Sequence, residues 1–493
     1  MHNFAKMMKM LRGEGKLTAL LAAATIAALP FVASAATYYA SPGGSGTGTS
    51  DSPCSLTVGI KKAIDNPSST LILKGGTYKL DEAIALTGAG YGLAPTIVRG
   101  ETDNPQDVIL DAQGKSEVMR VNQNVIVSGI TMMNGSNKGF ASGKYENRAS
   151  GVRVGWTTGS GMLSVVSNCV ITCCTNEFTN ITSINNYEVC GGAVAVFGNG
   201  RLLNSVVTNN TAVYRGGGVV MLKNGIVRNC QIVDNSAVSE GGGLFVERDA
   251  TGALVADSTI SNNRVTSGNG AGVANINPDT SLTLTNCTIK GNSASSVGGG
   301  LYLSNSTTTQ CQDCRIERNE AKSGGGTRIY GQAKGLFSGC VFDGNTANTD
   351  SDSGGGACFA SDPVGSGIAS FTNCVFRNNT SAGRGGAYFG GWGKLTRAEF
   401  VGCIITNNSC KRQGGGVCVR DDKTASLDTR FLMRNCLVAQ NRTTATGASD
   451  DASGAGVYLV AYANPVVDSC TIVSNDVAST SKSYGGGLYH RWG

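Results

Sequence analysis

A short segment recurs eleven times along this 493-residue chain, and the recurrence constrains the fold more than any other feature. Each copy is built around an Asn-Cys-x-Ile-like motif, with Cys at its key position in nine copies and Ser in two. Five residues later stands an Asn in ten of the eleven copies. A degenerate twelfth copy, Gly129 with Asn134, precedes them. The motif position is filled by Cys169, Ser205, Cys230, Ser258, Cys287, Cys314, Cys340, Cys374, Cys403, Cys436 and Cys470, and the later one by Cys174, Asn210, Asn235, Asn263, Asn292, Asn319, Asn345, Asn379, Asn408, Asn441 and Asn475. Repeats of this length are typical of solenoids, in which identical units stack.

The residues between the motifs predict short β-strands. Apolar residues alternate over a few positions, as at Leu301 and Leu303, and then give way to Asn, Gly and Ser. Each copy continues through a polar loop into a small-residue triplet such as Gly216 to Gly218, followed by an apolar residue. A copy therefore offers about three strands and three turns, and it can bury its apolar positions only against its neighbours. We predict an all-β, right-handed parallel β-helix of roughly 12 or more coils, with a strand spacing of about 4.8 Å.

The stack gives each recurrent residue type a structural role. Asn at a turn can hydrogen-bond along the helix axis, and an Asn or Asp one residue before the Cys, as at Asn168, suits a tight bend. Gly, which accounts for 70 residues, allows a positive φ or a close backbone approach at the triplets. The stacked Cys residues are expected to be free thiols filling a narrow inward position, because stacked Cβ atoms lie farther apart than a disulfide prefers. Cys358 and Cys418 are predicted to share a second column, and Cys54, Cys173, Cys174, Cys190 and Cys410 remain open to local bridges.

The first 35 residues have the three parts of a secretory signal peptide. Basic residues such as Lys6 and Lys16 precede an apolar run over 17–32, which closes on Ala33, Ser34 and Ala35. We therefore divide the chain into a signal peptide (1–35), an N-terminal cap with the first coils (36–128) and the repeat region (129–493), and expect no transmembrane segment after cleavage. The net charge of +6 falls close to neutral without the leader, which gives no reason to expect a nucleic-acid partner. The protein is expected to be secreted or held at the outer cell surface.

The repeats resemble those of a known family. Phe376 to Asn379 followed by Gly385, Gly386 and Ala387, together with Gly191 to Val194, resemble the FxxN and GGAI repeats of polymorphic outer-membrane proteins. More broadly, the chain is similar to the pectate-lyase-like β-helix superfamily, whose N-terminal caps resemble 36–43 and 75–78. The resemblance implies a fold and leaves the function open. Polymorphic outer-membrane proteins carry a C-terminal β-barrel, whereas this sequence stops after a Gly triplet, so we expect an uncapped last coil, as in a piece of a longer surface protein.

The residue inventory narrows the possible chemistry. Beyond the leader the only His is His490, which excludes Ser-His-Asp catalysis and His-ligated metals, and no metal site is predicted. Polygalacturonase-type hydrolases of the superfamily use a Gly-His-Gly motif that is absent here. Pectate-lyase-type enzymes use Ca²⁺ held by Asp residues with an Arg or Lys base, so Ca²⁺ is expected only if the protein is a lyase. The candidate catalytic residues are Asp362, Asp421, Asp422 and Lys423, with Asp362 and Asp422 predicted in one column and Trp392 beside Asp421 as a sugar platform. The alternative interpretation is a solvated turn with local charge pairing.

A second candidate surface is a column of aromatic residues two positions after the triplets. It contains Phe245, Tyr302, Phe389, Tyr458 and Tyr489. Exposed on a flat parallel sheet, with Trp392, these rings could stack on sugars; alternatively, loops cover them. The sequence thus favours a secreted or surface scaffold that presents loops and an aromatic face for adhesion or for binding a polysaccharide or host glycan, with no cofactor. The alternative is a polysaccharide lyase or glycoside hydrolase.

Overall fold

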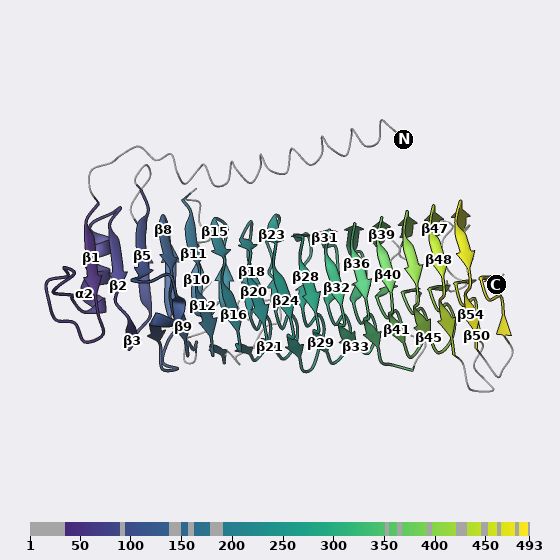
Figure 1. Cartoon of the computed structure of the whole chain (residues 1–493), viewed down its shortest axis with the longest axis horizontal. Coiled ribbons are helices and arrows are strands. Elements are labelled where there is room, and N and C mark those ends of the chain that lie inside the picture. Colours follow the sequence, from purple (N-terminus) through teal and green to yellow (C-terminus); the bar gives the residue numbers. More distant parts are fainter. Residues whose placement is uncertain are drawn as a thin grey trace, which may run out of the picture.

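The chain forms an elongated parallel β-helix in a computed structural model, which confirms the predicted fold class (Figure 1). The structure describes residues 35–88, 94–137, 149–155, 162–177, 191–350, 354–361, 367–391, 397–420, 431–444, 452–460, 465–478 and 483–491. The coils stack along the long axis of the rod, and every paired strand of the described residues runs parallel to its neighbour. The proposed leader, 1–35, lies outside the described residues except for Ala35.

A coil contains four strands rather than the predicted three. One representative coil comprises β35 (Lys334–Ser338), β36 (Val341–Asp343), β37 (Thr346–Ala347) and β38 (Cys358–Ser361). The additional element, β37, is two residues long and belongs to an 11-stranded ladder. Strands this short carry too little periodicity to be recognised in a sequence.

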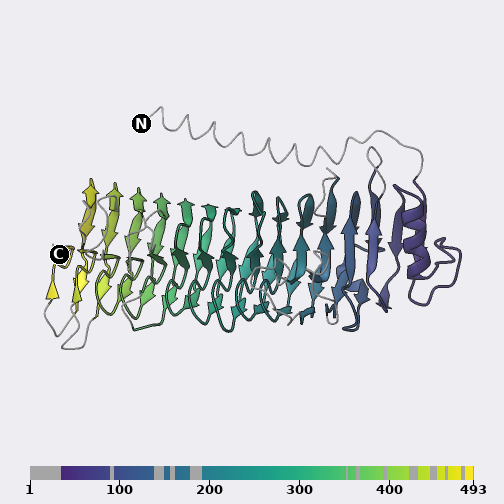
Figure 2. The ribbon, with the colours of Figure 1, turned by 180° about the vertical axis from the view of Figure 1, so that it is seen from behind.

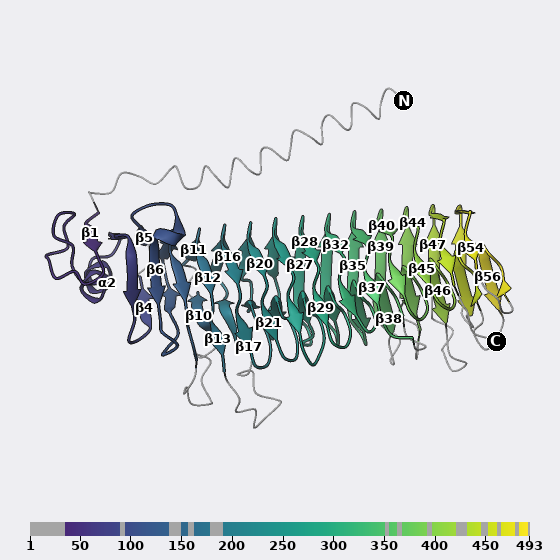
Figure 3. The ribbon, with the colours of Figure 1, turned by 60° about the horizontal axis from the view of Figure 1, so that its bottom comes forward.

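The strands of successive coils form four stacked sheets. Sheet A has 15 strands from β1 (Thr37–Ala40) to β52 (Val466–Asp468), and sheet B has 14 from β3 (Gly76–Lys79) to β53 (Thr471–Val473). Sheet D is the ladder from β13 (Thr175–Asn176) to β54 (Asp476–Val477), and a further pair joins β50 (Ala452–Ser453) to β55 (Ser483–Tyr484). Sheet C has 14 strands (Figure 3): β4 (Ile84–Thr87), β7 (Met119–Asn122), β10 (Ala149–Val154), β14 (Gly192–Val196), β18 (Val219–Met221), β22 (Leu244–Val246), β26 (Val273–Asn275), β30 (Leu301–Leu303), β34 (Thr327–Tyr330), β38, β42 (Tyr388–Gly390), β46 (Val417–Arg420), β51 (Val457–Val460) and β56 (Leu488–Arg491).

The predicted Asn column is a continuous hydrogen-bonded ladder inside the B-to-D turn. In each coil the backbone N–H and the side-chain Nδ2 of one Asn both donate to the Oδ1 of the Asn in the next coil. For Asn345 to Asn379 both distances are 2.9 Å. The same Nδ2 also reaches the carbonyl of Ile316 in the preceding coil, at 2.8 Å. Asn210 to Asn441 are almost completely buried, so each ladder bond satisfies groups that water cannot reach.

The other two recurrent features also behave as predicted. Asn168 has a φ of 50°, and equivalent residues before the Cys position in later coils adopt the same left-handed conformation. Gly216 has a φ of 69°, and a Cβ on Gly218 would lie 2.6 Å from the carbonyl oxygen of Gly243. These geometries explain the recurrence of Asn, Asp and Gly at their positions.

The Cys column consists of buried free thiols that bond to backbone carbonyls. The Cys314 Sγ donates to the oxygens of Leu284 and Gln312 at 3.4 and 3.3 Å. The Ser205 hydroxyl takes the same position, donating to Leu203 and accepting from the N–H of Cys169. Cys54, Cys173, Cys174 and Cys410 are also free thiols, and Cys190 lies outside the described residues.

The two ends of the rod differ. At the N-terminal end lies α2 (Leu56–Asp65), a helix that the sequence analysis missed (Figure 2). Its Leu56 and Ile60 pack against the core. At the other end Leu488 is 40% exposed, whereas its register partner Val457 is fully buried. Among the described residues, a helix therefore covers the N-terminal end of the core, and the coil farthest from it is partly exposed.

Candidate functional site

The length of the connections distinguishes one sheet from the others. In each of the eleven coils from β11 (Ser164–Ser167) to β52, the A-to-B and B-to-D turns contain two residues. The connections entering and leaving sheet C vary: 322–326 precedes β34, whereas 348–357 precedes β38. Length variation without loss of the fold is typical of functional loops. The outward face of sheet C, which these connections border, is therefore the candidate site.

One outward side chain per coil forms a column along this face, called here the outer column. The strand registers align Arg120, Arg153, Ala195, Val220, Phe245, Ala274, Tyr302, Arg328, Phe359, Phe389, Cys418, Tyr458 and Tyr489. Unlike the interior columns, it changes residue type from coil to coil. Arginines, small residues and aromatic rings all occur in it.

The predicted aromatic residues lie in the outer column, but most of them are not exposed. Phe245 and Phe389 are completely buried and Tyr458 nearly so, whereas Tyr302 and Tyr489 are half-buried. Phe245 packs with Val220 and Ala274 in an apolar cluster outside the sheet. The expectation of an open aromatic face is therefore wrong for Phe245, Phe389 and Tyr458, and the covered alternative describes them.

The register also corrects one predicted column. Cys358, not Ala357, pairs with Tyr388, and Tyr388 pairs with Val417. The coil carries four consecutive small residues, Gly354 to Ala357, and its left-handed residue is Gly355, with a φ of 76°. As a result Cys358 points into the core while Cys418 points outward, so the two do not share a column. Phe359 joins the outer column instead and stacks on Phe389, with ring centroids 5.0 Å apart.

The candidate catalytic residues Asp362, Asp421, Asp422 and Lys423, and the candidate platform Trp392, lie outside the described residues. They belong to the connections that leave β38, β42 and β46 toward sheet A. Cys358, Tyr388 and Val417 are registered partners on β38, β42 and β46. In the sequence, Asp362, Trp392 and Asp421 each follow their own registered residue by four positions, whereas Asp422 follows Val417 by five.

A buried ion cluster occupies the N-terminal part of the face. The Glu117 carboxylate accepts from Nε of Arg120 at 2.7 Å and from Nε and Nη2 of Arg153 at 2.8 and 3.3 Å. Glu117 and Arg153 are almost fully buried. Burial raises the pKa of the Glu117 carboxyl above its ordinary value, and the two guanidinium groups oppose that rise. The charges of Arg153 and Glu117 thus balance inside the protein.

Arg328 lies at the centre of the outer column, on β34. Its Nη1 donates to the carbonyls of Ile329 and Phe359 at 2.8 and 3.2 Å, and its Nη2 donates to Ser361 Oγ at 2.6 Å. The guanidinium carbon lies 3.8 Å from the centre of the Phe359 ring and 5.1 Å from that of Tyr330. Tyr330 is 40% exposed, so this part of the face presents an aromatic ring to solvent. The sequence analysis missed Arg328, Arg153 and Glu117. For the two arginines, the available signal was a charged residue in a mostly apolar outer column.

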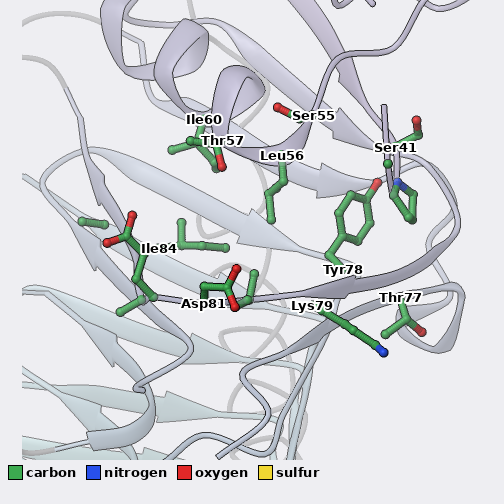
Figure 4. A pocket seen from close by; sticks show the side chains of 16 residues that line it. Ser41, Ser55, Leu56, Thr57, Ile60, Thr77, Tyr78, Lys79, Asp81 and Ile84 are labelled. Carbon is green, nitrogen blue, oxygen red and sulfur yellow. The ribbon is translucent and has the colours of Figure 1, made fainter. Parts of the chain in front are cut away.

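A cavity of about 930 Å³ lies at the N-terminal cap, between α2 and the turn from β3 to β4 (Figure 4). Leu56, Ile60 and Tyr78 line it, and Asp81 lies at its edge. The Tyr78 hydroxyl lies 2.8 Å from the carbonyl oxygens of Ala40 and Lys74, and Asp81 pairs with Lys115 at 2.8 Å. These polar groups already bond within the protein, so the cavity is a weaker candidate than the face of sheet C.

The repeats match a described family. The family profile for the right handed beta helix region matches residues 232–364 and 362–485, about half of the chain. The chain belongs to the right-handed β-helix family. No curated protein matches its sequence significantly. Nothing in these matches bears on the resemblance to polymorphic outer-membrane proteins, which stays a prediction.

Several solved structures match most of this chain at low identity. A mannuronic acid specific polysaccharide family 6 lyase from human gut microbiota is 11% identical, with a TM-score of 0.37 over 93% of this chain and 91% of that one. Pectate lyase Pel9A is 12% identical, with a TM-score of 0.32 over 80% and 79%. The catalytic unit of an α-1,3-glucanase from Streptomyces thermodiastaticus is 14% identical, with a TM-score of 0.33 over 92% and 70%.

The described residues were considered for membrane-spanning helices and for metal-binding groups. None of their helices is long and apolar enough to cross a membrane. They contain no group of three or more His, Cys, Asp or Glu side chains arranged to hold a metal ion.

Proposed function

We propose that this protein is a secreted or surface-held β-helical scaffold that binds an extended glycan across the outward face of sheet C. The observation that carries the proposal is that, in the eleven coils from β11 to β52, length variation is confined to the connections bordering that sheet. A parallel sheet repeats its surface at a regular spacing, which suits a polymer of repeating units. Tyr330 and the half-buried Tyr302 supply rings beside the central part of the face.

Binding can be tested on a glycan array with the purified protein. We expect retention of at least one polysaccharide, weakened in a Tyr302→Ala/Tyr330→Ala variant. Ile404→Ala removes an apolar side chain that is 40% exposed on β44 (Ile404–Thr406) of sheet B and serves as the control. Absence of retention across neutral and acidic polysaccharides, or equal weakening in the control, would contradict the proposal.

Cleavage of the bound polysaccharide is the second candidate function. It is favoured by one topological fact: Asp362, Asp421, Asp422 and Lys423 all belong to connections that leave sheet C. The protein would be incubated with uronic-acid and neutral polysaccharides, with and without Ca²⁺, while unsaturated products and reducing ends are followed. Turnover lost in Asp422→Ala and kept in Asp51→Ala, which changes an exposed residue of the cap, would favour an enzyme. Binding without turnover would favour the scaffold.

A further inference from the structure

Arg328 is a buried cation whose charge no carboxylate balances among the described residues. The side chain lies on the outward side of β34, and the residue is only 7% exposed. The side chains whose charges act on it most are those of Tyr302, Cys358, Tyr330 and Tyr388, none of which is a carboxylate. Burial of the guanidinium lowers the pKa of Arg328 to about 10. A charge placed this way is unfavourable for the folded protein unless something compensates for it.

The hydrogen bonds of Arg328 leave one edge of the guanidinium available. The group has five N–H donors, and the three bonds to Ile329, Phe359 and Ser361 use two on Nη1 and one on Nη2. The Nε–H and the second Nη2–H have no acceptor within the described part of the chain. Nε and Nη2 form the edge that binds an oxyanion through two parallel hydrogen bonds.

The other buried arginine of the outer column shows what a balanced site looks like. Arg153 is buried to a similar degree, and its Nε and Nη2 both bond to the two carboxylate oxygens of Glu117, at 2.8 and 3.3 Å. The same edge that Arg153 fills with an internal carboxylate is the edge that Arg328 leaves unfilled. No described residue fills that edge of Arg328, which leaves it available to an oxyanion ligand.

The neighbours of Arg328 indicate what such a partner looks like. The exposed Tyr330 ring lies beside the guanidinium, and Phe359 stacks beneath it. A sugar ring could lie against Tyr330 while an acidic substituent reaches the Nε–Nη2 edge. We propose that Arg328 is an anion subsite that binds a carboxylate or sulfate group of an acidic glycan. This inference rests on the proposed glycan-binding function and narrows its ligand to acidic polymers.

The test compares three soluble polymers by affinity electrophoresis: polygalacturonate, which carries carboxylates, dextran sulfate, which carries sulfates, and unmodified dextran. We expect the wild-type protein to bind one of the two acidic polymers, and Arg328→Gln to weaken that affinity about tenfold or more, as loss of a bidentate charged contact would. The acidic polymer that binds identifies the group. Arg228→Gln removes an exposed arginine on sheet A and should leave the affinity unchanged.

The outcomes separate this inference from the proposal on which it rests. Full affinity of Arg328→Gln for the acidic polymer, or wild-type binding of dextran alone, overturns the anion subsite while glycan binding stands. Equal weakening in Arg228→Gln also overturns it, since any surface cation would then serve. Binding of none of the polymers, here or on the array, overturns both. If Arg328→Gln does not fold, Arg328→Lys decides: it keeps the charge without the two-donor edge, and full affinity would contradict the proposal.

Discussion

The Asn ladder in the B-to-D turn and the outer column on sheet C both run along the rod, yet their residues vary in opposite ways. In the ladder, coil after coil carries the same residue with the same bonds, as from Asn345 to Asn379. In the outer column an arginine, an alanine, a phenylalanine or a cysteine can occupy equivalent positions. The coil geometry requires Asn at the ladder position, whereas it accepts many residue types in the outer column. Residues in the outer column that lower stability are therefore the ones to examine for function.

The largest expected effect is a fall in the free energy of unfolding at high pH, caused by the buried thiols. Burial raises the pKa of Cys169, Cys174 and Cys410 to about 12 from an ordinary value of 9.0. Below pH 9 both folded and unfolded chains keep these protons. Above it the unfolded chain loses them first, so stability falls with rising pH, by about 1.4 kcal/mol per unit for each thiol. Urea unfolding should show a loss of about 3 kcal/mol from these three thiols between pH 9 and 10.

The control for the alkaline effect is Cys410→Ser. Ser already occupies the equivalent position at Ser381 in the preceding coil, so the variant should fold. It removes one of these thiols and should reduce the loss between pH 9 and 10 by about 1 kcal/mol. An unchanged slope would show that the thiols are not its cause.

The next prediction breaks the ladder at one position. Asn345→Leu deprives the N–H and Nδ2 of Asn319 of their acceptor and removes the bonds to Ile316 and Asn379. Leaving these buried groups unsatisfied should lower the free energy of unfolding by about 3 kcal/mol, measured by urea denaturation. Asn348→Leu changes an exposed residue in the same coil and should have a small effect. Comparable losses of unfolding free energy in both variants would contradict a special stabilising role for the Asn ladder.

A pair of substitutions sharpens the contrast within the outer column. Arg153→Met leaves Glu117 with Arg120 as its remaining partner and should destabilise the protein by about 2 kcal/mol. Arg328→Met removes a buried charge without a carboxylate partner and should stabilise it by about 1 kcal/mol. Opposite shifts in Tm are expected. Destabilisation by both would show that Arg328 serves the fold.

The smallest effect concerns the Cys column. Cys314→Ser should cost less than about 1 kcal/mol, because Ser205 and Ser258 make the equivalent bonds to Leu203 and Ala256. Cys314→Leu should cost more, since it overfills a closely packed inward position. Thermal unfolding of both variants measures the difference, and equal costs would contradict the role of the hydroxyl or thiol bonds.

The sequence predicted the structure best at positions where every coil requires the same backbone conformation or hydrogen bonds. The Asn ladder, the left-handed turn at Asn168 and the glycine at Gly216 were predictable because few side chains meet those requirements. The register at Gly354 to Ala357 was not, because four small residues in a row hide which of them adopts the positive φ. Arg328 escaped notice for a related reason: its burial and its lack of a carboxylate partner are properties of contacts between coils.

The contrast between the two ends determines where this molecule comes apart. Each coil contacts only its neighbours, so a terminal coil is held from one side. At the N-terminal end α2 supplies the other side, whereas Leu488 and Val473 in the coil farthest from it remain partly in water. In a protein of these 493 residues, opening should therefore propagate one coil at a time from that exposed end toward α2. Amide exchange should then slow progressively along the rod, and the residues around Arg328 should open well after the coil that contains Leu488.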